Sequence, residues 1–186
     1  FKGYSSSMLS YVCERIGLRM HIFNSFEGLP KSESNQYTAG EFAGSRVEVT
    51  ENIKQFGCPD CVVLHKGYFC DSLRTMKMPK LISLWMDVDL ETSAKDVMTT
   101  FGSVDERGAV FSHECSPEHF ADGISGPRGP DSVVPPIIDA YEIAGAQIAG
   151  RFIRGNTGAF WRDRTGLPVI ENSITVSLAK NGFARM

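Results

Sequence analysis

The sequence has little excess charge of either sign and no cluster of basic residues. Its 19 Lys and Arg residues stand against 22 Asp and Glu residues, and the formal net charge is -3. A surface that binds nucleic acid usually carries Lys and Arg in a cluster with aromatic residues, so we expect no nucleic-acid partner. No apolar run approaches the roughly 20 residues that a membrane-spanning helix needs, and no charged-then-apolar leader is present. We therefore expect a soluble protein with no membrane partner.

Cysteine is scarce, and its spacing does not form a disulfide pattern. Five cysteines are an odd number scattered through 186 residues, which favours a reducing compartment over a disulfide scaffold. We therefore expect the protein to lie in the cytoplasm. Cys58 and Cys61 have the spacing of half a zinc site or of a redox pair, but no second such pair follows. The favoured interpretation is a junction between a loop and a strand.

Length and composition set the number of domains. With 42% hydrophobic residues, the chain is long enough for one buried core and too short for two full-sized domains. We expect a single domain over residues 1–186. The sequence opens at Phe1 without an initiator methionine, and helix signals follow at once. A first strand is therefore expected immediately before Phe1, missing from this chain.

Strand and helix signals alternate along the sequence. Strands are predicted at residues 19–23, 61–64, 81–86 and 108–112, and helices at residues 5–16, 45–56, 94–101 and from residue 135. The first helix is predicted because Met8, Leu9, Val12 and Ile16 repeat at helical spacing until Gly17 ends the run. Residues 152–162 and 174–179 have the composition of two late strands, interpreted as an antiparallel pair at a sheet edge. The alternation predicts an α/β fold, with a mostly parallel sheet and helices on both faces.

In such sheets ligands bind outside the carboxyl ends of the strands, so the polar and glycine residues there are candidate site residues. The candidates on the first three turns are Gly3, Tyr4, Ser5, Asn24, Ser25, Gly67 and Phe69. Gly3 precedes a serine-capped helix, where backbone N–H groups receive a carboxylate or phosphate. Asn24 either binds ribose hydroxyls or forms a turn, and Phe69 either stacks on an adenine or belongs to the core.

Acidic residues gather at the ends of the next two strands. Asp87 and Asp89 follow one strand, and His113 and Glu114 follow the other. Because these strands are expected to be neighbours, their oxygen and nitrogen atoms can converge on a divalent cation. The alternative is a solvated rim of charge. Clustered carboxylates without a cation are expected to raise the pKa of at least one of the acids.

Several short segments, in this order, resemble the macrocin O-methyltransferase family. Asn-Ser-Phe-Glu-Gly-Leu-Pro at residues 24–30 is similar to the family's Asp-Ser-Phe-x-Gly-Leu-Pro, and Gly-Tyr-Phe-Cys-Asp-Ser-Leu at residues 67–73 to its Gly-Trp-Phe-x-Asp-Thr-Leu. Leu-Trp-Met-Asp-Val-Asp-Leu at residues 84–90 looks like its Leu-Arg-Leu-Asp-x-Asp-Leu strand. Residues 1–5 look like the tail of its glycine-containing first motif. The likeness ends near Cys115.

The resemblance implies a Rossmann-like class I methyltransferase fold. It also implies methyl transfer from S-adenosylmethionine to a hydroxyl of a small-molecule acceptor, often a sugar of a natural product, with Mg²⁺ holding the acceptor oxygens. By position in these motifs, the residues that surround the cofactor are Gly3, Tyr4, Ser5, Asn24, Ser25, Gly67 and Phe69. Asp87, His113 and Glu114 take the metal positions, and Asp87 and His113 are the candidate bases. A homo-oligomer is an open alternative to a monomer.

Three residues of the candidate site depart from the family pattern. Asn24 stands where the family has a ribose-binding Asp, and His113 and Glu114 stand where it has a pair of Asp residues. The second change allows a metal softer than Mg²⁺, or no metal with His113 as general base. Two other classes stay open: a nicotinamide-dependent oxidoreductase on a similar sheet, and a non-catalytic relative.

Overall fold

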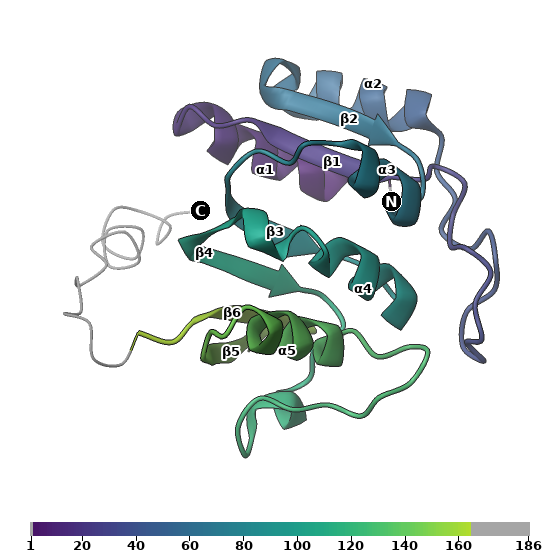
Figure 1. Cartoon of the computed structure of the whole chain (residues 1–186). Helices are drawn as coiled ribbons and strands as arrows, with labels where there is room; N and C mark the ends of the chain where they lie inside the picture. Colours follow the sequence, from purple (N-terminus) through teal and green to yellow (C-terminus); the bar gives the residue numbers. More distant parts are fainter. Residues whose placement is uncertain (1, 165–186) are drawn as a thin grey trace.

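The computed structural model describes residues 2–164, in which helices and strands alternate along the chain (Figure 1). The helices are α1 (Tyr4–Arg15), α2 (Arg46–Phe56), α3 (Phe69–Thr75), α4 (Glu91–Met98) and α5 (Val134–Ile143). The strands are β1 (Met20–Asn24), β2 (Val62–Lys66), β3 (Leu81–Met86), β4 (Val104–Ser112), β5 (Ile148–Arg154) and β6 (Thr157–Arg162). Short 3-10 helices lie at η1 (Pro59–Cys61), η2 (Phe101–Ser103) and η3 (Pro117–Phe120). The predicted α/β class is confirmed.

The strands form two separate sets of hydrogen-bonded neighbours. β1 and β2 pair in parallel, and β3, β4, β6 and β5 follow one another in a second set. β3 and β4 are parallel, whereas β6 is antiparallel to both β4 and β5. In Figure 1 the pair β1–β2 lies at the top, and the four-stranded set lies below it with α4 and α5 in front. Within residues 2–164, the edge of β1 away from β2 and the edge of β3 away from β4 pair with no strand.

The antiparallel edge pair exists, but its strands differ from the prediction. Residues 152–162 are not one strand, because Gly155 and Asn156 have φ angles of 56° and 61° and turn the chain between β5 and β6. Two successive residues with positive φ are the requirement of a tight hairpin turn. The pair is therefore built within residues 148–162, and the second predicted strand, residues 174–179, lies outside the described residues.

The main core lies between the four-stranded set and helices α4 and α5. Register aligns Leu84 of β3 with Val110 of β4, and Val110 with Phe160 of β6. Side chains alternate between the two faces of a strand, so these three share one face, and the core includes Val110 and Phe160 together with Val97 of α4 and Ile137 of α5. The apolar stripe predicted for α4 is buried. This packing fixes where β3 and β4 end.

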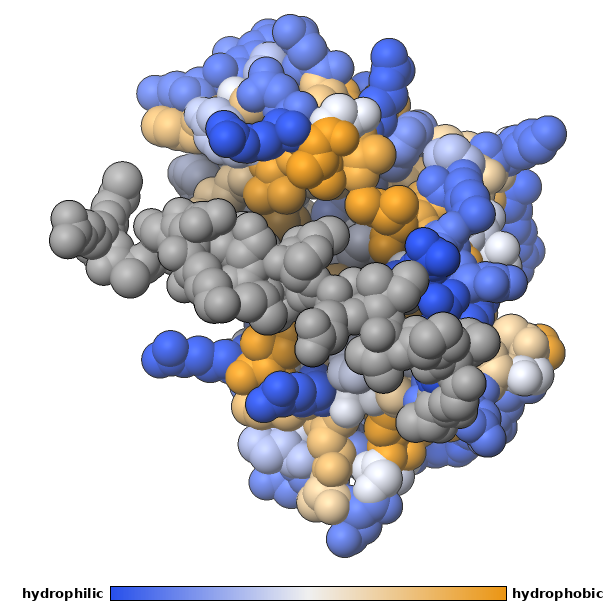
Figure 2. Space-filling model, turned by 90° about the vertical axis from the view of Figure 1, so that its left-hand side faces the viewer, coloured by the Kyte–Doolittle hydropathy of each residue, from blue (hydrophilic) through white to orange (hydrophobic). Residues whose placement is uncertain are grey.

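Helix α1 buries serines and exposes its apolar residues. Its buried residues are Ser7 and Ser10, because Cys58 N–H donates to Ser10 Oγ at 2.8 Å and a Cβ on Gly57 would lie 2.7 Å from that oxygen. Only small side chains fit such a close approach. The apolar residues whose spacing predicts the helix are exposed, namely Met8 (75%), Leu9 (38%), Val12 (55%) and Ile16 (55%). Figure 2 shows apolar surface on the side of the molecule that faces left in Figure 1.

The Cys58–Cys61 segment forms the predicted junction. It makes η1, and β2 begins at Val62 directly after it. The thiol of Cys58 donates to Glu14 Oε2 at 3.0 Å, and this hydrogen bond raises the pKa of Cys58 to about 11. All five cysteines are free thiols. No helix within residues 2–164 has the length and apolar character needed to cross a membrane.

Candidate functional site

The parallel pairing of β3 and β4 brings the acidic strand ends together. Met86 aligns with Ser112, and the next N–H along β4, that of His113, donates to the Met86 carbonyl at 2.9 Å. Asp87 and His113 therefore leave the sheet side by side. The hydroxyl of Ser112, a fully buried residue, donates to the His113 carbonyl at 2.7 Å and holds the chain at this end. The predicted gathering of these strand ends is confirmed.

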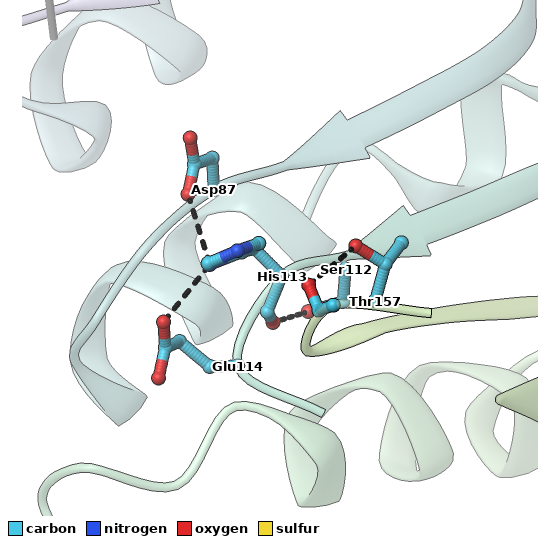
Figure 3. A network of polar contacts seen from close by, with 6 residues as sticks. Asp87, Ser112, His113, Glu114 and Thr157 are labelled. Atoms are coloured by element: carbon cyan, nitrogen blue, oxygen red, sulfur yellow. Dashed lines mark hydrogen bonds and ion pairs between the residues drawn. The ribbon is translucent and has the colours of Figure 1, made fainter. Parts of the chain in front are cut away.

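The imidazole of His113 lies between two carboxylates (Figure 3). Its Nδ1 is 2.9 Å from Glu114 Oε1 and 3.6 Å from Asp87 Oδ1. A carboxylate only accepts hydrogen bonds, so Nδ1 is the nitrogen that carries a proton, and in the neutral ring Nε2 keeps its lone pair. A neutral histidine oriented in this way is suited to accept a proton.

Glu114 adopts a backbone conformation that side chains other than glycine avoid. Its φ is 64°, in the left-handed region where Cβ crowds the following carbonyl at a cost of about 1–2 kcal/mol. Strain of this kind gathers at functional sites and is held by the surrounding structure. Here the neighbouring Cys115 N–H donates to the Asn156 carbonyl at 2.8 Å, which ties the strained residue to the β5–β6 turn.

Asp89 belongs to the same acidic group. Its burial, and then the charges of Glu114 and Asp87, raises the pKa of Asp89 to about 6, while His113 acts in the opposite direction. The raised pKa lies at Asp89, which was not among the predicted metal ligands, and its largest cause is burial rather than the neighbouring carboxylates. A carboxyl with such a pKa changes its charge close to physiological pH.

The loop between β1 and α2 reaches the acidic group. The Leu29 N–H donates to the Glu41 carbonyl and the Gly40 N–H to the Leu29 carbonyl, each at 2.9 Å, so the loop folds back on itself. This places Tyr37 beside the acids: its burial, and then the charges of Glu114, Asp89, Asp131 and Glu41, raises its pKa. Neither Tyr37 nor Glu41 was predicted as a site residue, because neither follows a strand.

As they lie, the predicted metal ligands do not form a cation site. Within residues 2–164, no group of three or more His, Cys, Asp and Glu side chains is arranged to hold a metal ion. His113 Nδ1 carries a proton toward Glu114, so this nitrogen has no lone pair to offer a cation. His113 therefore contacts Asp87 and Glu114 directly, without a shared centre for a cation.

The candidates at the ends of β1 and β2 lie together, namely Asn24, Ser25 and Gly67. Several of their polar groups form hydrogen bonds within these turns. The Gly67 N–H donates to the Asn24 carbonyl at 3.1 Å. The Asn24 side-chain oxygen accepts from the Phe26 N–H at 2.6 Å, which is the turn-forming alternative. Ser25 Oγ donates to the Gly28 carbonyl at 2.8 Å. The side-chain NH₂ of Asn24 is left as a donor for a ligand hydroxyl.

The remaining cofactor candidates lie at the starts of α1 and α3. Gly3 is the N-cap of α1, with φ 84°, and a Cβ added there would lie 3.0 Å from Val49 Cγ1 of α2. Tyr4 and Ser5 are exposed in the first turn. Phe69 opens α3 and packs against the main core, which favours the core alternative over adenine stacking. Whether these residues line one cleft with Asn24 stays a prediction.

A cavity of about 300 Å³ opens next to Glu114. Its polar lining comes from Gln36, Glu114, His119, Asp131 and Ser132, and Pro130 and the start of α5 complete the wall. None of these residues except Glu114 was predicted as a site residue. Gln36, His119 and Asp131 lie on long connections. The expectation that ligands bind at the carboxyl ends of strands does not identify residues there.

The architecture and the strand-end site together define the class I methyltransferase fold, and two solved structures share this fold. One is the O-methyltransferase NovP, with 21% identity, 84% of this chain and 66% of NovP covered, and a TM-score of 0.63. The other is an O-methyltransferase family protein from Burkholderia thailandensis, with 16% identity, 86% of this chain and 48% of that protein covered, and a TM-score of 0.52. The chain thus spans about half to two thirds of their length.

Residues 6–111 match the family described as macrocin O-methyltransferase. This stretch is more than half of the chain and contains the three motif segments at residues 24–30, 67–73 and 84–90. The chain belongs to the macrocin O-methyltransferase family. No curated protein matches its sequence.

Proposed function

We propose that the protein transfers a methyl group from S-adenosylmethionine to a hydroxyl of a small molecule. The observation that carries the proposal is the placement of His113 between Asp87 and Glu114 at the strand ends, in a chain of this family. Methyl transfer needs mainly a positioned, deprotonated nucleophile, and a histidine that is hydrogen bonded at Nδ1 supplies a base for it. A sugar hydroxyl of a natural product is the proposed acceptor group.

In the proposed reaction His113 Nε2 takes the proton from the acceptor hydroxyl. Glu114 holds the imidazole in the required tautomer and stabilises the imidazolium that forms, while Asp87 adds a second negative charge near Nδ1. The acceptor oxygen then forms a bond to the methyl carbon as the sulfur–carbon bond breaks. S-adenosylmethionine supplies the electrophilic methyl group when bound.

The cofactor is proposed to lie along the first three strand ends. The N–H groups at the start of α1, after Gly3, are suited to its carboxylate, and the Asn24 NH₂ to a ribose hydroxyl. Tyr4, Ser5, Ser25, Gly67 and Phe69 complete the proposed surroundings by position in the family motifs. The Asn24 side chain binds without the charge assistance of an Asp, so we expect weaker cofactor binding than an Asp gives.

A metal-assisted reaction is the alternative that an experiment must separate. The full-length protein is titrated with S-adenosylmethionine by calorimetry, and methyl transfer is then followed with and without a chelator. Activity that survives the chelator supports His113 as base, whereas activity lost and restored by Mg²⁺ or Mn²⁺ supports a cation at Asp87, His113 and Glu114. Cofactor binding without any turnover would favour a non-catalytic relative, and binding of a nicotinamide cofactor instead would favour an oxidoreductase.

Replacing the proposed base gives the matched mutational test. His113→Gln is expected to lower kcat by about 10²–10⁴-fold, the usual contribution of general acid–base catalysis, with cofactor affinity unchanged. His21→Gln is the control, because His21 lies on β1 and stacks on His65 away from β3 and β4. Equal kcat in the His113 variant and the wild type would remove His113 from the mechanism.

The complete sheet and the cellular setting are also proposals. The unpaired edges of β1 and β3 support a further strand between them, which we expect to precede Phe1. The free thiols support a cytoplasmic location. Self-association into a homo-oligomer is proposed from the exposed apolar side chains of α1.

A further inference from the structure

The Cys-Pro-Asp-Cys segment at residues 58–61 forms a tight turn. The Cys61 N–H donates to the Cys58 carbonyl at 3.4 Å, and Pro59 presets a φ angle that suits the second position of such a turn. The first and fourth Cα atoms of a turn lie within about 7 Å of each other, and disulfides usually join Cα atoms about 4.4–6.8 Å apart. The backbone therefore holds these two cysteines within reach of a disulfide bond.

The two thiols are neighbours on the same side of α1. Cys61 Sγ lies 3.2 Å from the Cys58 carbonyl oxygen and 3.3 Å from the Ser10 carbonyl oxygen. Cys58 Sγ donates to Glu14 Oε2 at 3.0 Å. Each thiol therefore contacts α1 through a hydrogen bond that needs the thiol proton, and a disulfide sulfur carries no proton.

The two thiols differ in their access to solvent. Cys58 is 9% exposed, whereas Cys61 is only partly buried. The hydrogen bond to Glu14 raises the pKa of Cys58 to about 11, so Cys58 remains a thiol at neutral pH. Thiol–disulfide exchange begins with the attack of an accessible thiolate. An oxidant in solution therefore reacts with Cys61 first, and Cys58 is placed to react second.

Cys13 is a competing partner for Cys61. Burial, and then the charge of Cys61, raises the pKa of Cys13, so the two residues lie within electrostatic range. Cys13 belongs to α1, however, and shares no turn with Cys61. Closing a bond within a short turn costs little chain entropy, which favours Cys58 as the partner.

We propose that Cys58 and Cys61 form a reversible redox pair, which a low-molecular-weight disulfide oxidises and which loosens α1 when its own disulfide forms. The Cys61 thiolate attacks one sulfur of the oxidant, so that a mixed disulfide forms and one thiolate leaves and takes up the proton that Cys61 lost. Cys58 then passes its proton to Glu14 and attacks the Cys61 sulfur, and the second small thiol leaves with that proton. Two protein thiols are oxidised to one disulfide, while one small disulfide is reduced to two thiols.

The contacts with α1 favour the reduced state. The hydrogen bonds from Cys58 to Glu14 and from Cys61 to Ser10 exist only in the dithiol, and an interaction made by the dithiol alone shifts the equilibrium toward it. The pair therefore stays reduced in a reducing compartment. Its oxidation removes both contacts at the C-terminal half of α1, independently of the proposed methyl transfer.

The experiment equilibrates the full-length protein with mixtures of reduced and oxidised glutathione, blocks the free thiols and digests the protein with trypsin. Cleavage after Lys54 and Lys66 yields residues 55–66, which contain the two cysteines of the pair and no other. We expect this peptide to become lighter by two hydrogen atoms, and to regain them in excess reduced glutathione. Cys13 falls in residues 3–15, so its bond to Cys61 would appear instead as a cross-link between two peptides.

Cysteine variants test the order of the two steps. Cys58→Ser is expected to stop at the mixed disulfide on Cys61, and Cys61→Ser to remain unmodified at Cys58. Cys70→Ser is the control, because Cys70 lies on α3, and it is expected to form the disulfide as the wild type does.

A variant of α1 tests the stabilisation of the reduced state. Glu14→Gln is expected to raise the equilibrium constant for oxidation by glutathione by about threefold to tenfold, the scale of one hydrogen bond to an exposed carboxylate. Glu51→Gln is the control, because Glu51 is an exposed acid of α2 that pairs with Lys54, and it is expected to leave this constant unchanged.

Limited digestion of the folded protein measures the loosening of α1. Arg15 is exposed and ends the helix directly after Glu14. We expect trypsin to cleave after Arg15 about threefold faster or more in the oxidised protein, because local opening admits the protease. Cleavage after Arg154, exposed at the end of β5, is expected to be equal in the two states.

The peptide masses of the wild type decide the inference without a variant. No change in the mass of residues 55–66, glutathione retained on Cys61 without closure, a cross-link to Cys13, or equal cleavage after Arg15 in both states would overturn it. Thermal unfolding checks that each variant is folded. A reversible loss of two hydrogen atoms from residues 55–66, together with faster cleavage after Arg15, supports the redox pair.

Discussion

Glu114 combines a strained backbone with the hydrogen bond that orients His113. Its φ of 64° is unfavourable for any residue with a Cβ. The native sheet and the Cys115–Asn156 hydrogen bond hold the conformation. The residue therefore couples local instability to the chemistry proposed for its neighbour.

Glu114→Gly is expected to stabilise the protein and to lower its activity. Glycine adopts this φ freely, so the free energy of unfolding is expected to rise by up to about 1 kcal/mol, while the loss of the carboxylate lowers kcat. Urea unfolding and turnover assays measure the two effects. Asn156→Gly is the control, because asparagine already tolerates a φ of 61°. Unchanged or lower stability in Glu114→Gly would contradict the strain argument.

The residues at the strand ends were predictable from the sequence, and those on the long loops were not. Asp87, His113 and Glu114 follow strands with strong apolar patterns, and parallel strands bring their carboxyl ends to one edge. Asp131 and His119 reach the same place through connections whose paths depend on tertiary contacts. No local pattern encodes such a path.

At the scale of elements, α1 is attached to η1 through a serine. Ser10 Oγ accepts the Cys58 N–H at 2.8 Å and donates to the Ser7 carbonyl at 2.6 Å, and the residue is fully buried. Ser10→Ala leaves the Cys58 N–H without its partner, so we expect a loss of about 1–3 kcal/mol in the free energy of unfolding. Ser5→Ala, on the exposed side of α1, is expected to have little effect. Equal stability of the two variants would show that the contact contributes nothing.

An ion pair between Arg128 and Asp139 links the loop at the cavity wall to α5. It predicts a pH dependence of stability. Arg128 lowers the pKa of Asp139 below its ordinary value of 3.8. A carboxyl with a lowered pKa stabilises the fold at pH values above its ordinary pKa, and the effect is lost as pH falls through the lowered value. Asp139→Asn is therefore expected to lower Tm at neutral pH and to make less difference at about pH 3. Because both side chains are partly exposed, the shift is small, and an equal shift at both pH values would contradict it.

The elements themselves were predicted unevenly. Residues 81–86 form β3 with the predicted bounds, because an apolar run this short favours a buried strand over a helix. The β5–β6 turn was missed because Gly155-Asn156 reverses the Asn-Gly order that usually marks such turns. The spacing of the apolar residues predicted helix α1 but not their exposure, because periodicity identifies an apolar face without identifying what covers it.

For the whole molecule, the exposed apolar side chains predict self-association of this chain. Large hydrophobic residues are exposed on α1 and also at Ile82 and Trp85 of β3. Large exposed apolar patches mark interaction sites or association. Sedimentation velocity of the 186-residue chain is expected to show a weight-average mass that rises with concentration. A Met8→Lys variant on α1 should weaken this effect, and a monomer at all concentrations would contradict the prediction.

The edges of β1 and β3 that pair with no described strand can be monitored through their backbone amides. On β1 and on β3, alternate amide groups point away from the paired neighbour and toward the space between the two sets of strands. In the 186-residue chain these amides are expected to exchange with deuterium far faster than the amides shared between β3 and β4. If a longer form of the protein places a strand between β1 and β3, the same amides become protected, while those along β5 and β6 do not change. Hydrogen–deuterium exchange of the two forms, followed by mass spectrometry, therefore shows whether a strand pairs with these edges.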